Sequence, residues 1–387
     1  KFRESRDGIE QRLADNGNEN LLVSLKDRYG DYGIVGFVSI NSLGVIEHFL
    51  FSCRVLNLGV KQAMLQYLKS GTNIKLSRQF ESFRRLANGP ADWITIIEKD
   101  NFSEEIETSI NSGKRIVFRG GCDLSQVLFY LQSEKNLKFI EELTYVNQDG
   151  CAVHNDHTYH LMGALKGQNE DVKGHPLYDS LATQTQAFSP ETDAIILSLL
   201  MDMTQDYYED VKTGEIYPFG GYFDYSNHEI ASEMLPPATI DKLFDCKEAK
   251  IRRCLGDDLV EFEKRLSLIC ENIKKPIIFI NGAECASPLP AEIWGCDRHI
   301  KFNSVIDKIV GKYDHVSLVD VRKLVSPKDL ADNIRHYNRT VYKLISEELA
   351  NIVNDQVGVK LTSKSTLSAL ISKIYSKVSS LRQEKRV

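Results

Sequence analysis

Residues 114–124 have the sequence KRIVFRGGCDL, in which an apolar strand runs into a glycine turn and then into a helix. The apolar residues after the turn recur at helical spacing, at Leu124, Val127, Leu128 and Leu131. Two glycines permit a steep turn, so the residue at its apex is presented at the carboxyl end of the strand. This pattern is typical of a nucleophile elbow, with Cys122 in the position of the nucleophile.

Further apolar strands follow along the chain, at 194–200, 276–280 and 316–319. Helical patterns lie around them, at 123–133, 238–273, 300–312 and 338–353. Buried strands separated by helices predict an α/β fold, with a flavodoxin-like parallel sheet covered by helices. We assign this domain to residues 99–353.

The first 98 residues have a different pattern and predict a small α+β domain. A polar helix is expected up to about residue 21, then strands at 22–26, 34–40 and 45–51 and a helix at 60–69. A further strand is expected at 73–80, followed by a short helix and the apolar run 93–97. Residues 354–387 form a third segment, a tail with an amphipathic helix at 366–381.

Composition narrows the class of protein. The chain has 387 residues, of which 42% are hydrophobic and 26% charged, which excludes collagen-like and wholly disordered chains. A net charge of -6 gives no basic excess for a nucleic-acid partner, and no apolar run is long enough to span a membrane. Eight cysteines without a Cys-x-x-Cys pair or a secretory signal predict reduced thiols in the cytoplasm. The abrupt start without Met suggests a fragment of a longer protein.

Two blocks in the N-terminal segment resemble the FkbH-like family. They are DRYGDYGIVG at 27–36 and FLFSCRV at 49–55, followed by Gly59 and Val60. In that family a HAD-type phosphatase-like domain precedes a domain similar to GNAT acyltransferases, and members load glyceryl units onto carrier proteins. The resemblance covers residues 1–97. It implies a partial GNAT-like domain, an absent HAD-type domain supplied in cis or in trans, an acyl carrier protein as partner, and a role in polyketide or surface-polysaccharide biosynthesis.

A GNAT domain binds the pantetheine pyrophosphate at a helix N-terminus, through the pattern Arg-x-x-Gly-x-Gly/Ala. Here Arg54 and Gly59 fit, but Asn57 stands where the first glycine should let the backbone approach the ligand. The resemblance therefore leaves two interpretations: a site for a phosphopantetheine-bound acyl donor, or a degenerate scaffold.

The late segment DNIRHYNR, at 332–339, precedes the predicted helix at 338–353. Together with the early elbow it resembles the SGNH/GDSL hydrolase family over residues 113–350, with Cys122 in place of serine. The resemblance implies that His336 is the base and that Asp332 or Asn333 orients it, as in Cys–His–Asn proteases. Gly121 and the helix that follows it would bind the oxyanion, while the neighbouring Asp123 would oppose a thiolate.

Two segments in the middle of this domain are also candidates for the site. The family's oxyanion Asn is expected after the third strand, where Asp202 stands instead; its carboxylate would repel an oxyanion but could bind a substrate hydroxyl or a cation. The aromatic stretch 207–225 predicts either a hairpin lid over a sugar or acyl pocket or a packed surface hairpin. After the strand at 276–280, Cys285 is expected at the active edge, and Arg298 and His299 at the cap of a surface helix.

Our main hypothesis is an acyltransferase or thioesterase-like enzyme that works through an acyl-Cys122 intermediate and passes the acyl group to a sugar, another alcohol or water. One alternative is a metal-dependent hydrolase, because a metal-ligating set occurs in one short run: His154, Asp156, His157 and His160. Another is a non-catalytic module that binds a carrier protein or a glycan.

Overall fold

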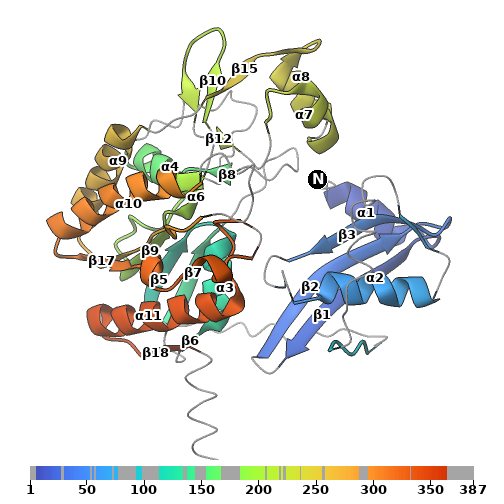
Figure 1. The fold of residues 1–387 in the computed structure, drawn as a ribbon, viewed down its shortest axis with the longest axis horizontal. Helices are drawn as coiled ribbons and strands as arrows, with labels where there is room; N and C mark the ends of the chain where they lie inside the picture. The colour runs from blue at the N-terminus through green and yellow to red at the C-terminus, as the bar shows by residue number, and fades with distance from the viewer. Residues whose placement is uncertain are drawn as a thin grey trace, which may run out of the picture. The chain divides into compact units, whose positions relative to one another are not determined.

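The computed structural model describes residues 6–27, 30–52, 55, 58–71, 74–76, 93–97, 113–133, 137–143, 154–166, 184–204, 207–217, 219–220, 224–235, 237–254, 258–286, 295–331 and 333–363. These residues fall into two compact units, divided near residue 110 (Figure 1). Each unit has its own sheet and its own core, so each is treated by itself.

The smaller unit is a four-stranded sheet with a helix packed on it. Strands β1 (Glu19–Asp27), β2 (Gly30–Ile40) and β3 (Val45–Phe51) are antiparallel, and β4 (Lys75–Leu76) lies parallel to β3. Helix α2 (Val60–Gly71) adds Met64, Leu65 and Leu68 to a core with Val38, Ile46 and Phe49. This arrangement accounts for the apolar positions of α2, because their helical spacing puts them on one face.

The sequence-based boundaries at both ends of this unit are wrong in part. Helix α1 (Arg6–Ala14) ends early, and β1 already begins at Glu19. The expected strand at 73–80 is reduced to β4 in the described residues, and residues 93–97 are not a strand. Short apolar runs without a pairing partner carry little information about strand formation.

The larger unit is built on a five-stranded parallel sheet, which confirms the predicted α/β fold. Its strands, in chain order, are β5 (Lys114–Arg119), β7 (Leu137–Glu142), β9 (Ala194–Ser198), β16 (Ile277–Ile280) and β17 (Val316–Val319). Their order in the sheet is β17-β16-β9-β5-β7, and every neighbouring pair is parallel. Numbered along the chain this is 2-1-3-4-5, the flavodoxin-like order, whose switch point lies between β5 and β9.

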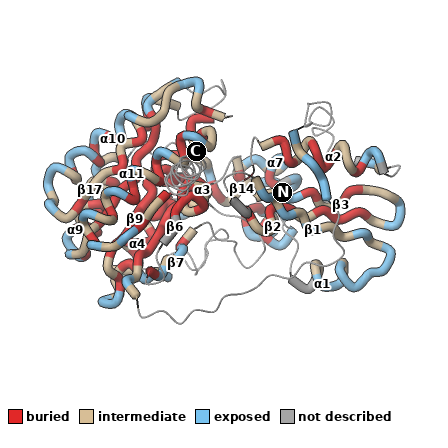
Figure 2. The backbone as a smooth tube through the Cα atoms, turned by 90° about the horizontal axis from the view of Figure 1, so that it is seen from below, coloured by how far each residue is buried: buried red, intermediate tan, exposed pale blue. Residues whose placement is uncertain are grey.

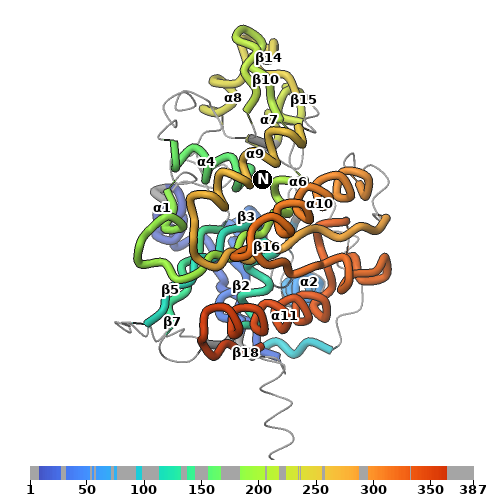
Figure 3. Tube along the Cα trace, turned by 90° about the vertical axis from the view of Figure 1, so that its left-hand side faces the viewer, coloured from blue at the N-terminus to red at the C-terminus, as the bar shows by residue number. Residues whose placement is uncertain are grey.

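Helices cover the sheet, and Figures 1 and 3 show them in layers. Helix α3 (Cys122–Tyr130) packs with α11 (Arg339–Val357), while α4 (His157–Lys166), α9 (Leu259–Asn272) and α10 (Gly295–Lys312) pack with one another. The central strands β5, β9 and β16 and the helix faces toward them are largely buried; buried residues are red in Figure 2. The main core joins alternate strand residues to α4, α9 and α10, for example Val117, Ile195 and Phe279 with Leu161, Phe262 and Phe302.

The predicted helix at 238–273 is wrong in its middle. The chain there forms α8 (Pro237–Leu243), a hairpin of β13 (Phe244–Asp245) and β14 (Glu248–Ala249), and then β15 (Ile251–Cys254) before α9. Cys246 has φ 59°, a left-handed conformation that makes the tight turn between β13 and β14. Strand β15 pairs with β10 (Tyr207–Asp210). This tertiary pairing outweighs the local helix propensity of the segment.

The aromatic segment forms a packed hairpin rather than a lid in its described part. Strand β10 pairs with β11 (Ile216–Tyr217), and Tyr208, Tyr217 and Tyr225 are buried. They share a small core with α7 (His228–Met234) and α8, and Tyr208 Oη accepts a hydrogen bond from the N–H of Tyr225 at 2.8 Å. Aromatic side chains that fill their own core are not available to line a pocket.

The remaining described elements are short. Strand β8 (His154–Asn155) pairs with β12 (Phe219–Gly220), β6 (Leu131–Ser133) pairs with β18 (Leu361–Ser363), and α6 (Leu200–Thr204) follows β9. Among all the described residues, no helix is long and apolar enough to cross a membrane. The expected tail helix at 366–381 lies outside the described residues.

Packing of α9 against the sheet should dominate the stability of the larger unit. Leu266 is fully buried in the main core, whereas Val260 on the same helix is 77% exposed. We expect Leu266→Ala to lower the free energy of unfolding by about 2–5 kcal/mol, because it removes buried surface and leaves a cavity. Val260→Ala should change it by less than about 0.5 kcal/mol. Urea unfolding of both variants measures the difference, and equal effects would contradict the assigned core.

Candidate active site

Close neighbours at the elbow after β5 favour residues without a Cβ. A Cβ on Gly120 would lie 2.8 Å from Ser198 Cβ, and one on Gly121 would lie 2.8 Å from Met201 Cγ. Neither glycine has a positive φ, so space and not backbone conformation selects them. The turn therefore places Cys122 at the first residue of α3, at the switch point of the sheet.

A buried ion pair joins the ends of β5 and β7, on the side of β5 that faces away from β9. Arg119 is the last residue of β5, and its Nη1 donates to Glu142 Oε2 at 2.8 Å, both side chains being buried. Glu142, at the end of β7, also accepts from Thr185 Oγ1 at 2.8 Å and from the N–H of Gln186 at 2.6 Å. Because all these partners satisfy the carboxylate, this pair ties the carboxyl ends of β5 and β7 together.

The imidazole of His336 comes from a loop that is held by its own hydrogen bonds. The N–H of Ala331 donates to the carbonyl of His336 at 2.7 Å, and the N–H of Asn338 donates to the carbonyl of Asp329 at 2.7 Å. The side chain of Asn338 caps α11 by accepting from the N–H of Val341 at 3.1 Å. The start of α11, which packs on α3, thus fixes where His336 lies.

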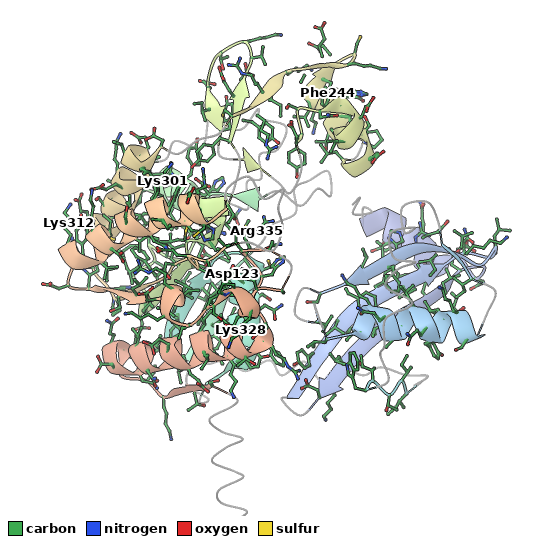
Figure 4. All side chains as sticks on the ribbon, viewed as in Figure 1. Asp123, Phe244, Lys301, Lys312, Lys328 and Arg335 are labelled. Carbon is green, nitrogen blue, oxygen red and sulfur yellow. The ribbon has the colours of Figure 1, made fainter. Side chains whose placement is uncertain are left out.

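The two ends of the domain meet at Cys122 and His336. Cys122 Sγ lies 3.9 Å from His336 Nε2, although the two residues are 214 positions apart. On the far side of the ring, Asn333 Nδ2 lies 3.2 Å from His336 Nδ1. Figure 4 labels Asp123, which follows Cys122 in the sequence, and Arg335, which precedes His336. Asn333, one of the two predicted orienting residues, therefore lies next to the imidazole, while the other, Asp332, lies outside the described residues.

Two tyrosines connect the histidine loop to the strand next to β9. Tyr342 Oη accepts from the N–H of Tyr337 at 3.3 Å, and Tyr337 Oη accepts from the N–H of Ala283 at 3.4 Å. Burial raises the pKa of Tyr342 well above its usual range, and the neighbouring Cys122 adds to the effect. Both phenols stay protonated and serve as fixed hydrogen-bond groups behind the site.

Asp123 does not line the approach to the thiol in the way expected for an oxyanion group. It is 5% exposed, and its Oδ2 accepts from Ser198 Oγ at 2.5 Å. Burial raises the pKa of Asp123, while the hydrogen bond from Ser198 opposes that shift. Ser198 had no predicted role, yet the flavodoxin order puts the end of β9 beside the elbow and could have identified it.

Asp202 has a different role from the expected substrate contact. It is fully buried, and its carboxylate accepts from the N–H of His157 at 3.1 Å, from the N–H of Thr158 at 3.0 Å and from Thr158 Oγ1. A carboxylate at the first turn of a helix complements the free N–H groups there. Asp202 therefore caps α4 and is not an oxyanion or substrate ligand.

The described side chains of the run proposed as a metal site are buried in the domain. Asp156 accepts from Arg265 Nη2 at 3.1 Å and from Tyr207 Oη at 2.8 Å, and His157 and His160 are 5% and 1% exposed. Burial and then Arg119 lower the pKa of His160 to about 3. Among the described residues no group of three His, Cys, Asp or Glu side chains could hold a metal ion, and the side chain of His154 is not described. The metal-dependent alternative is not supported.

The other expected surface residues are also in the interior. Arg298 and His299 on α10 are 2% and 0% exposed, and His299 Nδ1 lies 2.7 Å from the carbonyl of Ala283. They do not cap a surface helix. Cys285 follows β16 as expected and is partly buried.

In the smaller unit the expected loop is described only in part. Arg54 and Asn57 lie outside the described residues. Gly59 precedes α2 with φ +81°, which favours glycine, and a Cβ there would be 2.7 Å from the ring of Trp93. Trp93 Nε1 donates to the carbonyl of Leu58 at 3.1 Å. The indole thus lies directly against the start of α2.

No family model matches the sequence, and no curated protein matches it. Among solved structures, a carbohydrate acetylesterase family member from Sinorhizobium meliloti is similar at 12% identity over 64% of this chain and 100% of that chain, with a TM-score of 0.31. An aryl esterase from M. smegmatis is similar at 12% identity over 63% and 100%, with a TM-score of 0.30. An acetyl xylan esterase from the rumen bacterium Butyrivibrio proteoclasticus is similar at 13% identity over 65% of each chain, with a TM-score of 0.27. Such distant similarity carries no information about chemistry, which rests on the side-chain geometry.

The buried carboxyl groups of Asp156 and Asp202, next to α4, should make the free energy of unfolding depend on pH. Burial, and then the charge of Asp202, raises the pKa of Asp156 to about 8. Its pKa in the unfolded chain is about 4, so its contribution is complete below about pH 4 and is lost as pH rises to about 8. We expect Asp156→Asn to flatten the decline of unfolding free energy across this window, by up to about 1.4 kcal/mol per pH unit.

Urea unfolding at several pH values measures this slope. Asp258→Asn, at the exposed N-cap of α9, is the matched control and should keep the slope of the unaltered protein. A slope that Asp156→Asn leaves unchanged would mean that Asp156 is ionised throughout, held so by Arg265.

Proposed function

We propose that the larger unit is an SGNH-like acyltransferase or thioesterase that carries the acyl group on Cys122. The observation that supports it best is the contact of Cys122 Sγ with His336 Nε2 at 3.9 Å, with Asn333 on the other ring nitrogen. A thiol, an imidazole and an orienting group in this order are the parts of a nucleophilic cysteine site. The residues come from the two ends of the domain and meet at the switch point, where α/β folds bind ligands.

The first turn of α3 supplies groups for the developing oxyanion. Gly121 is its N-cap, and we propose the backbone N–H of Cys122 as the donor, because the N–H groups of Asp123 and Leu124 donate to the Asp123 carboxylate. Such N–H groups stabilise negative charge on the carbonyl oxygen and favour a thiolate at the same position. This role would replace the Asn that the SGNH pattern places after the third strand.

We propose thioesters of a phosphopantetheine carrier as donors, with glyceryl as one acyl unit. The support for this is the FkbH-like resemblance of residues 1–97, which also implies an acyl carrier protein as partner and a HAD-type domain acting in cis or in trans. The same resemblance supports a place in polyketide or surface-polysaccharide biosynthesis, and the cysteine pattern supports a cytoplasmic location. The candidate acceptors are a sugar, another alcohol, or water.

The covalent intermediate can be tested directly by intact-mass measurement. We expect incubation with small acyl thioesters to add one acyl group to the protein, and Cys122→Ala to abolish this adduct. Turnover of the thioester should fall at least about 10³-fold in Cys122→Ala, because the nucleophile is removed.

Cys254→Ala is the matched control, since Cys254 is another partly buried thiol, on β15 and outside the site. It should keep both the adduct and the turnover. Full turnover in Cys122→Ala would disprove the mechanism. A Cys122 that reacts with iodoacetamide but with no acyl thioester would favour a binding module instead.

A further inference from the structure

The loop that follows β16 lies along one face of helix α10. Asn303 holds its first part, because Asn303 Nδ2 donates to the carbonyl of Gly282 at 2.8 Å and to Glu284 Oε1 at 2.9 Å. One helical turn closer to the start of α10, His299 Nδ1 lies 2.7 Å from the carbonyl of Ala283. Both helix residues are fully buried. The loop therefore runs toward the first turn of α10 as it leaves the sheet.

A cysteine comes next on each of these two segments. Cys296 is the second residue of α10, three positions before His299 and seven before Asn303. Residues at this spacing share one face of a helix, so Cys296 is on the face that contacts the loop. Cys285 follows Ala283 by two residues on the loop. The course of the loop past His299 therefore brings Cys285 beside the helical turn that carries Cys296.

The electrostatics of the two thiols agree with this placement. Burial, and then the charge of Cys296, raises the pKa of Cys285. Burial, and then the charges of Asp297 and Glu284, raises the pKa of Cys296. Both cysteines are free thiols in partly exposed residues, which a small molecule in solution can reach. They are thus a pair of neighbouring thiols at the surface of the larger unit.

The same loop contacts the segment that carries His336. The N–H of Ala283 donates to Tyr337 Oη at 3.4 Å, and Tyr337 follows His336 in the chain. Cys285 also lies near this segment, because the charge of Asp329 contributes to the raised pKa of Cys285. A covalent bond at Cys285 would therefore fix a loop that packs directly against the proposed site.

We propose that Cys285 and Cys296 form a reversible disulfide that ties the loop after β16 to the start of α10. The oxidant is a low-molecular-weight disulfide. The thiolate of one cysteine attacks a sulfur of that disulfide, and one small thiolate leaves with the electron pair of the broken S–S bond. The other cysteine then attacks the protein sulfur of the mixed disulfide and expels the second small thiolate. The protein loses two electrons and two protons, and the small disulfide becomes two thiols.

This bond would report the thiol–disulfide balance around the protein. Disulfides of cytoplasmic proteins are mostly transient and act in catalysis or in redox sensing. Neither half of the exchange uses Cys122 or His336, so the bond does not depend on the proposed acyl chemistry. Because the two cysteines are eleven positions apart, the bond also closes a loop in the unfolded chain and should stabilise the folded state.

Incubation of the folded protein with oxidised glutathione tests the pair. We expect one new disulfide between the peptides that contain Cys285 and Cys296, detected by non-reducing peptide mass mapping and removed by dithiothreitol. Glutathione bound to either residue should stay below about a tenth of the crosslinked form, because the second step is intramolecular. The urea midpoint of unfolding should be higher for the oxidised protein than for the reduced protein.

Variants and other thiols of the chain supply the controls. Cys285→Ser should leave Cys296 with bound glutathione and should abolish the rise in the urea midpoint. Cys254→Ser removes another partly buried thiol, on β15, and should keep both the crosslink and the rise. Cys270 is fully buried in the main core, so it should stay unmodified as long as the protein is folded.

Three results would overturn the proposal. One is glutathione on both Cys285 and Cys296 without a bond between them, while Cys270 stays unmodified. Another is a crosslink of either residue to a third cysteine, such as Cys122, in place of the expected one. The last is a pair that stays reduced under conditions in which the exposed Cys246 takes up glutathione. None of these results bears on acyl transfer, which the adduct on Cys122 tests separately.

Discussion

The structure of the larger unit depends on how closely β5 and β9 approach each other at their carboxyl ends. A Cβ at Gly120 would lie 2.8 Å from Ser198 Cβ at the end of β9, so the chain turns there without a side chain. That turn starts α3 at Cys122, and the packing of α3 on α11 brings the loop of His336 to the thiol. A local steric limit in one pair of strands thus sets a contact between residues 214 positions apart.

Buried charges strengthen this frame around the site without taking part in it. Arg119 and Glu142 tie two strand ends together, Asp202 caps α4, and Arg265 donates a hydrogen bond to Asp156. Removing one partner of such a pair leaves an uncompensated charge in the interior and costs more than the pair contributes. The conspicuous acids and histidines of the middle segment are therefore best explained by the support of helices and strands.

The sequence was sufficient for the parallel sheet and the elbow because both follow from local patterns: apolar strands, paired glycines and helical spacing. The SGNH-like resemblance led us to expect His336 with Asp332 or Asn333 at the site; the structure describes His336 and Asn333 next to each other, and Asp332 stays a prediction. Errors arose where tertiary contacts decide the outcome. Residues 244–254 form strands because β10 offers a partner, and the helix expected at 238–273 is interrupted there.

Asn333 shows why residue identity at one position can matter more than the presence of a complete triad. In a Ser–His–acid site the acid accepts from Nδ1–H, which frees Nε2 to remove the proton of a hydroxyl. Here the amide of Asn333 lies next to Nδ1 of His336, and its oxygen accepts from the N–H of Arg335. A thiol ionises closer to neutral pH than a serine hydroxyl, so it needs less activation by an acid–imidazole pair. The proposed site therefore combines a nucleophile that needs little activation with an amide beside the imidazole.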